Sequence, residues 1–149
     1  MPGDDIYQQL RGYYLDEIAP GMTAGYDKRI EDADVQAFAG LSGDVNPLHL
    51  NPAFARATRF GRPVVHGMVT TSLWSTIVGT RLPGPGCAYM SQELKFLKPV
   101  FVGDTVVASM TVTELETERQ IVHMEALAHV GETLVACGHA RVWVPVRGA

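Results

Sequence analysis

The sequence predicts an α+β fold in which a curved antiparallel sheet wraps around one long central helix. Three observations predict it. The run PVVHGMVTTSLWSTIVG, residues 63–79, repeats apolar side chains at helical spacing. Four later segments alternate larger apolar side chains with smaller or polar ones, as strands do. Short polar connectors join the last three of these segments, which is typical of an antiparallel meander. One early buried helix followed by several strands favours a sheet packed around that helix.

The composition predicts a single globular domain over residues 1–149. Hydrophobic residues make up 46% of the 149, which is enough to bury a core. The net charge of −4 gives no bulk attraction to nucleic acid or to an anionic membrane. We therefore expect no nucleic-acid partner, and no membrane partner either, since no segment reaches spanning length.

The cysteines and the N-terminus predict a cytoplasmic protein. Cys87 and Cys137 have the spacing of neither a disulfide framework nor a structural zinc site. The first residues, MPGDDIYQQLRGYY, carry acids where a signal peptide needs basic residues and have no apolar core. No resident metal or other cofactor is indicated.

The first elements are expected to be a strand and a helix. A turn at Pro20-Gly21 leads into an edge strand within residues 14–30. From Asp32, apolar residues recur near helical spacing and acids occupy the first turn. This pattern predicts a short helix that ends near Gly43.

Two further helices are expected before the strands. Asn51 before Pro52 predicts an N-cap and a short helix through PAFARAT, followed by the loop RFGR. The central helix is expected from Pro63 to Gly79. Its apolar residues recur at Val65, Met68, Val69, Leu73 and Ile77. It contains no charged residue unless His66 is protonated, so other structure should largely cover it.

Four strands are expected in the second half of the chain. They are CAYMSQELKF, DTVVASMTVTELE, QIVHMEALAHV and TLVACGHARVWV, joined in part by TERQ and VGET. The alternation is clearest at Val106, Ala108, Met110 and Val112. His123, His129 and His139 fall within these segments and are interpreted as ordinary sheet residues.

The segment GDVNPLHLNP, residues 43–52, places an acid and a histidine close together. Asp44 and His49 are five positions apart, so a helix would turn them roughly 140° from each other and a strand would place them on opposite faces. The segment looks too broken for regular structure. Gly43 permits unusual dihedral angles and Pro47 biases its predecessor toward extended geometry. The chain can therefore bend and aim both side chains at one point.

A purely structural role is the alternative for this segment. Asp44 and Asn46 can form Asx-type turns, and His49 can cap or pack locally; spacing alone favours that interpretation. His66 and Gly67 shift the balance toward function, because a glycine amide near a helix start can be unpaired and can approach a substrate oxygen. Close packing of Gly67 against a strand explains that glycine equally well.

Together these segments resemble the R-specific enoyl-CoA hydratases of the MaoC-like family, which adopt the hot-dog fold. The resemblance runs from AFAGLSGD through DVNPLH and RPVVHGM to FLKPVFVGDTV, about half of the chain. It implies one MaoC-like hot-dog domain over residues 1–149. The implied reaction is reversible hydration of a trans-2-enoyl thioester to an R-3-hydroxyacyl thioester.

The resemblance also implies roles for individual residues. Asp44 and His49 are the implied catalytic pair that activates a water molecule. Gly67 is implied to donate its N–H to the thioester carbonyl, and Ser75 to line the pocket, although a small residue there also suits tight helix packing. The remaining expected substrate-side residues are Asn46, which more simply shapes the loop, and His66.

The implied substrate is an acyl-CoA or an acyl carrier protein thioester. Both carriers are anionic, and the basic residues available to rim the pocket are Arg59, Arg62, Lys95 and Lys98. The resemblance further implies a homodimer with the pocket near the subunit interface.

Four alternatives stay open. The chain could be a 3-hydroxyacyl-[acyl carrier protein] dehydratase, which runs the same chemistry in reverse. A hot-dog thioesterase is disfavoured because residues 63–79 contain no acid. A non-catalytic acyl-thioester-binding subunit is disfavoured by the intact acid and histidine. A metal site built from Asp44, His49 and His66 has suitable ligand types but no strong ligand spacing.

Overall fold

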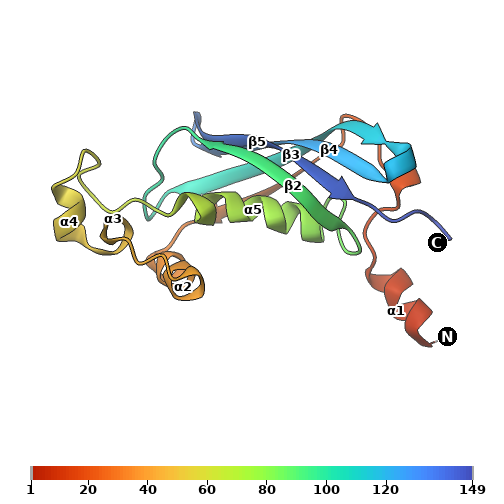
Figure 1. Ribbon diagram of the computed structural model, residues 1–149, viewed down its shortest axis with the longest axis horizontal. Coiled ribbons are helices and arrows are strands. Elements are labelled where there is room, and N and C mark those ends of the chain that lie inside the picture. Colours follow the sequence, from red (N-terminus) through yellow and green to blue (C-terminus); the bar gives the residue numbers. More distant parts are fainter. Residues whose placement is uncertain (1, 149) are drawn as a thin grey trace.

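The computed structural model describes residues 2–148 and contains one antiparallel sheet (Figure 1). Its strands are β1 (Thr23–Arg29), β2 (Ala88–Phe96), β3 (Thr105–Glu116), β4 (Ile121–Val130) and β5 (Thr133–Trp143). The order across the sheet is β1-β3-β4-β5-β2, so β1 and β2 form its edges. The predicted edge strand, the four later strands and the β3–β4–β5 meander are confirmed.

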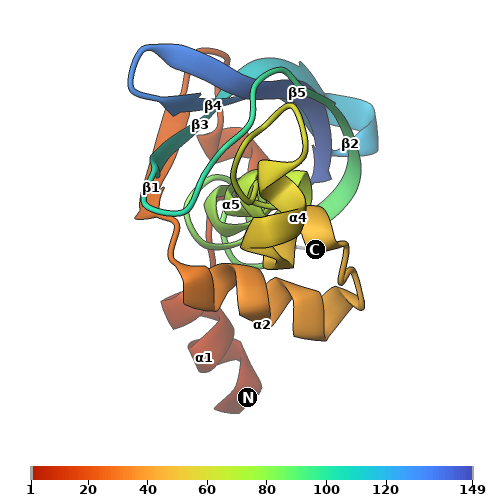
Figure 2. The same cartoon turned by 90° about the vertical axis from the view of Figure 1, so that its left-hand side faces the viewer.

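The helices are α1 (Pro2–Leu10), α2 (Asp32–Ser42), α3 (Pro47–Leu50), α4 (Pro52–Arg56) and α5 (Gly67–Thr80), with short 3-10 turns at Leu15–Glu17 and Thr117–Arg119. The helix α5 lies along one face of this sheet, with α2, α3 and α4 near one of its ends and α1 towards the other (Figure 1). Seen from the end, the sheet curves around α5, and α2, α3 and α4 gather at the start of that helix (Figure 2). This arrangement confirms the predicted α+β, hot-dog architecture. None of the helices within residues 2–148 has the length and hydropathy to cross a membrane.

The core lies between α5 and the concave face of the sheet. The alternating residues Val106, Ala108, Met110 and Val112 of β3 are all buried. On the helix, Trp74 is buried and its indole N–H donates to the carbonyl of Leu127 in β4 at 3.0 Å. The sheet therefore holds α5 both by apolar burial and by a directed hydrogen bond.

The central helix starts four residues later than predicted, at Gly67 instead of Pro63. Residues 63–66 are extended because their amides are bonded elsewhere: Val64 donates to the α3 segment at 3.2 Å and Val65 to the loop before β3 at 2.8 Å. These partners lie far away in the sequence, so local periodicity did not reveal them. The correction makes Gly67 the first residue of the helix.

The expectation that other structure largely covers α5 is only partly met. Its buried side includes Val69, Leu73 and Ile77, but Met68, Ser72 and Ser75 form an exposed stripe in the single chain. The stripe lies beside β2, none of whose residues is buried.

The histidines of the late strands are sheet residues, as interpreted, and two of them form a chain of hydrogen bonds. His123 contacts His139 Nε2 through Nδ1 at 2.9 Å and Glu116 through Nε2 at 2.7 Å. The hydrogen bond from His123 holds the pKa of the Glu116 carboxyl below its usual value. This cluster lies on the face of the sheet opposite α5, away from the cavity described next.

Candidate active site

The end of α2 determines where Asp44 is placed. Gly43 caps the helix in a left-handed conformation, φ 77°, and its amide donates to Ala39 at 2.9 Å. The Ser42 hydroxyl donates to the Phe38 carbonyl at 2.7 Å and accepts from the Asp44 amide at 3.1 Å. Asp44 therefore follows the helix directly on a fixed backbone.

The segment after Asp44 contains regular structure, contrary to expectation. Pro47–Leu50 forms the single turn α3, with proline at its first position. Asn46 caps it, since its Oδ1 accepts from the Leu48 amide at 3.0 Å, while the Asn46 amide donates to Asp44 Oδ1 at 3.2 Å. Both Asx-type turns of the structural alternative are present. They also project His49 from the turn of α3 toward the cavity.

One hydrogen bond fixes the chemistry of His49. Its Nδ1 lies 2.5 Å from the carbonyl oxygen of Val64. A carbonyl can only accept, so Nδ1 carries the hydrogen and Nε2 of the neutral ring keeps a free lone pair. His49 is thereby held in the tautomer that suits a general base.

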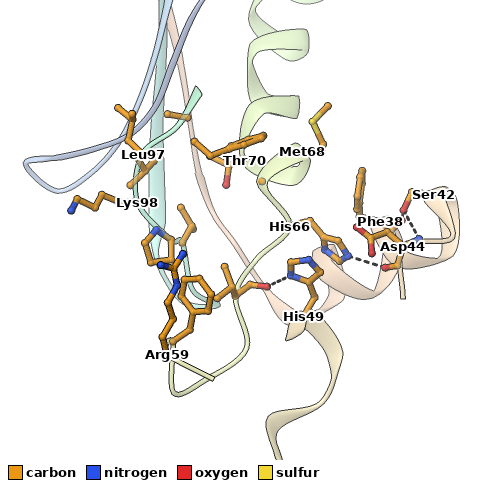
Figure 3. Close-up of a pocket in the computed structure, with 18 residues that line it drawn as sticks. Phe38, Ser42, Asp44, His49, Arg59, His66, Met68, Thr70, Leu97 and Lys98 are labelled. Carbon is orange, nitrogen blue, oxygen red and sulfur yellow. Dashed lines mark hydrogen bonds between the residues drawn. The ribbon is translucent and has the colours of Figure 1, made fainter. Parts of the chain in front are cut away.

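His66 contacts both Asp44 and His49 (Figure 3). It is 2% exposed, and its Nε2 donates to the main-chain carbonyl of Asp44 at 3.0 Å. Its ring stacks on that of His49 with centroids 3.9 Å apart. One ligand-type atom from each of Asp44, His49 and His66 lies within 4.8 Å of the others. The acid and the two histidines that the sequence singled out are therefore brought together.

Asp44, His49, His66 and Gly67 line one cavity of about 470 Å³. The apolar part of its wall comes from Phe38, Phe60, Val64, Met68, Phe96, Leu97, Pro99, Val100, Val135 and Ala136, and further polar groups come from Ser42, Arg59, Thr70 and Lys98. Asp44 is exposed and His49 is half-buried, so both can be reached from solvent. An apolar cavity with a few convergent polar groups is the usual form of a small-molecule site.

Two of the four candidate basic residues lie on this cavity, namely Arg59 and Lys98. Arg62 instead stacks its guanidinium over the Phe101 ring at 3.7 Å. Lys95 is exposed on β2 and does not line the cavity.

Gly67 has both a free amide and close packing against a strand, the two explanations given for it. As the first residue of α5 it has no intrahelical acceptor, and no residue from 2 to 148 accepts a hydrogen bond from its amide. A Cβ at this position would lie 2.6 Å from the ring of Phe96 in β2. Gly67 is therefore packed tightly against the sheet, and it also offers a free donor to the cavity.

Ser75 is not part of this group. It lines a second cavity, between α5 and β2, together with Tyr89, Gln92 and Leu94. The two cavities share only Phe38 and Met68 among their lining residues.

Sequence reasoning missed several residues of the first cavity. Thr70 gives a local signal, since it is a hydroxyl residue on a helix face that is otherwise apolar. Val135 and Ala136 give none, because only the pairing of β5 with β2 brings them beside Phe96.

A family model described as MaoC like domain matches residues 17–133. An "(R)-specific enoyl-CoA hydratase" from Rhodospirillum rubrum is 43% identical over 99% of this chain and 100% of its own length. Among solved structures, the (R)-hydratase of A. caviae has a TM-score of 0.83 at 46% identity, covering 86% of this chain and 98% of its own. An R-hydratase from Pseudomonas aeruginosa has a TM-score of 0.86 at 34% identity, covering 93% and 89%.

Proposed function

The chain belongs to the family of MaoC-like domains, and we propose that it is an R-specific enoyl-CoA hydratase whose Asp44 and His49 activate water. The observation that carries the proposal is the convergence of a carboxylate, a histidine with a free Nε2 and an unpaired amide on one apolar cavity. The similarity to R-hydratases over most of the chain supports the same reaction.

The first step of the reaction is the attack of water on the β-carbon of the enoyl thioester. His49 Nε2 and the Asp44 carboxylate hold the water, and the pair accepts its proton as the new C–O bond forms. The π electrons of the Cα=Cβ bond move toward the thioester oxygen. The Gly67 amide donates to that oxygen, which stabilises the developing charge by on the order of 3 kcal/mol.

The second step returns a proton to the α-carbon. The enolate re-forms its carbonyl, and Cα takes a proton from the acid–base pair, most simply from Asp44. One water has then been added across the double bond and the pair is restored. Because both groups lie on one wall of the cavity, the hydroxyl group and the proton are added to the same face of the substrate.

The proposed substrate is an acyl-CoA thioester. Its acyl group fits the apolar wall, while Arg59 and Lys98 give positive charge for the anionic carrier. We also propose that the protein forms a homodimer and works in the cytoplasm, where the two unpaired cysteines stay reduced.

The test is the loss of enone absorbance when purified protein meets crotonyl-CoA, with the configuration of the product determined. We expect the R-3-hydroxy thioester from wild type and a fall in kcat of about 10²–10⁴-fold in Asp44→Asn and His49→Ala. Matched controls are Asp27→Asn and His129→Ala, which change the same residue types outside the cavity and should keep wild-type rates.

Other outcomes identify the alternatives. Release of free thiol from a saturated acyl-CoA indicates a thioesterase, and loss of activity with a chelator indicates a metal at Asp44, His49 and His66. The proposal is contradicted if the folded wild-type protein hydrates neither short-chain nor medium-chain enoyl-CoAs. Full activity of His49→Ala contradicts the role given to that residue.

A further inference from the structure

Two buried polar side-chain atoms within residues 2–148 have no hydrogen-bond partner, and both belong to residues that line the first cavity, the one that contains Asp44 and His49. They are His66 Nδ1 and Thr70 Oγ1. His66 Nε2 donates to a carbonyl, so Nδ1 of the neutral ring can only accept. Among residues 2–148, the Thr70 hydroxyl is thus the buried side-chain donor that has no partner. Because proteins rarely leave a buried polar group unpaired, such an atom needs an explanation.

The neighbouring hydroxyls show that Thr70 differs from ordinary helix residues. The Thr71 hydroxyl donates to the Met68 carbonyl at 3.4 Å and the Ser72 hydroxyl to the Val69 carbonyl at 2.5 Å. Such bonds to the preceding turn are the usual arrangement inside a helix. Thr70 makes none, although it is only 3% exposed.

Thr70 and Gly67 lie close together at the start of α5, and both line the first cavity. The two residues are three apart, so they share a helix face one turn from each other. Helical side chains cover the turn on the N-terminal side of their own Cα. The side chain of Thr70 therefore lies over the first turn of α5, which begins with the free Gly67 amide. Figure 3 shows Thr70 on the cavity side of the helix, opposite Leu97 and above His66.

We propose that Thr70 donates a second hydrogen bond to the thioester oxygen that the Gly67 amide binds. This inference rests on the proposed hydratase function and adds a catalytic residue to it. The negative charge that develops on the oxygen during water attack would then be shared by one amide and one hydroxyl. A carbonyl oxygen has two lone pairs, so one thioester oxygen can accept from both donors at once.

The experiment compares Thr70→Val, Thr70→Ser and Thr71→Val in crotonyl-CoA hydration. Valine has nearly the shape of threonine but lacks the hydroxyl, so we expect kcat of Thr70→Val to fall by about 10²-fold with little change in KM. Serine keeps the hydroxyl and should restore most of kcat. Thr71→Val removes a buried hydroxyl at the next position, outside the first cavity, and should leave kcat unchanged.

The melting temperature of each variant separates catalysis from structure. A hydroxyl without a partner in the free protein contributes no hydrogen bond to stability, so Thr70→Val should melt at or above the wild-type temperature. A lower melting temperature would mean that the hydroxyl has a structural partner, which overturns the inference. The same conclusion follows if serine does not restore kcat.

The two proposals fail in different ways. If wild type hydrates crotonyl-CoA and Thr70→Val does so equally well, the inference about Thr70 is wrong and the proposed function stands. If wild type hydrates no enoyl-CoA, the proposed function is wrong and the role of Thr70 fails with it.

Discussion

At Gly67 the lack of a side chain does two things. It lets the Phe96 ring of β2 approach the start of α5, and it leaves the amide of that residue open to the cavity. Glycine suits this first helical position because a methyl group there would overlap the Phe96 ring.

We predict that Gly67→Ala destabilises the protein by less than about 1 kcal/mol, because the Phe96 ring must move but is 53% exposed and can shift toward solvent. The displaced ring also belongs to the cavity wall, so hydration of crotonyl-CoA should slow. Urea unfolding and steady-state kinetics measure the two effects.

Gly40→Ala is the matched control for this substitution. Gly40 lies within α2, and a Cβ there meets nothing within 4 Å. Gly40→Ala should stabilise the protein by up to about 1 kcal/mol. The double variant Gly67→Ala with Phe96→Leu should recover part of the lost stability, and strict additivity would show that the ring is not the cause.

The short helices α3 and α4 begin in the same way but have different roles. Asn46 caps α3 through the Leu48 amide, and Asn51 caps α4 through the amides of Ala53 and Phe54. In both, proline follows the cap. Only α3 carries a residue of the acid–base pair.

We predict that Asn46→Ala and Asn51→Ala each lower the free energy of unfolding by about 0.5–2 kcal/mol, the usual effect of losing an N-cap. Their activities should differ. Loss of the α3 cap frees the turn that orients His49, so kcat of Asn46→Ala should fall, whereas Asn51→Ala should keep it. Denaturant unfolding and crotonyl-CoA kinetics test this, and equal losses of kcat would contradict a specific role for Asn46.

The elements of the whole molecule were predictable where the signal was local. Period-two alternation, the Asn51 cap and Gly43 each act within a few residues, so the strands, α4 and the end of α2 were predicted correctly. The start of α5 was not, because hydrogen bonds to distant segments hold residues 63–66 extended. The short helix α3 was missed because Pro47 looked like a breaker although proline suits a first helical position.

The candidate site was predictable to the same extent. Asp44 and His49 belong to one short motif, and Gly67 to a helix start, so residue types and spacing indicated them. Thr70 emerged only once its hydroxyl was seen to lack a partner. Val135 and Ala136 depend on which strand pairs with β2, a choice that chain-wide topology makes.

The two edges of the sheet differ in character. On β1 the exposed side chains are Thr23, Asp27 and Arg29, which discourage another strand from pairing. On β2, Met90 is 59% and Phe96 is 53% exposed beside the charged Glu93 and Lys95, and the exposed stripe of α5 lies alongside. Apolar surface at an open edge favours association, so the proposed homodimer should form through β2.

We predict that wild type elutes at about twice its chain mass of 16.2 kDa in size-exclusion chromatography with light scattering. Met90→Asp puts a charge into the apolar patch and should shift the protein toward monomer, while Asp27→Lys on the opposite edge should not.

The second cavity opens at the exposed stripe and shares Met68 with the first cavity. Dissociation should therefore also lower kcat/KM, most strongly at low protein concentration. A wild-type monomer with full activity at every concentration would contradict the dimer and its link to the site.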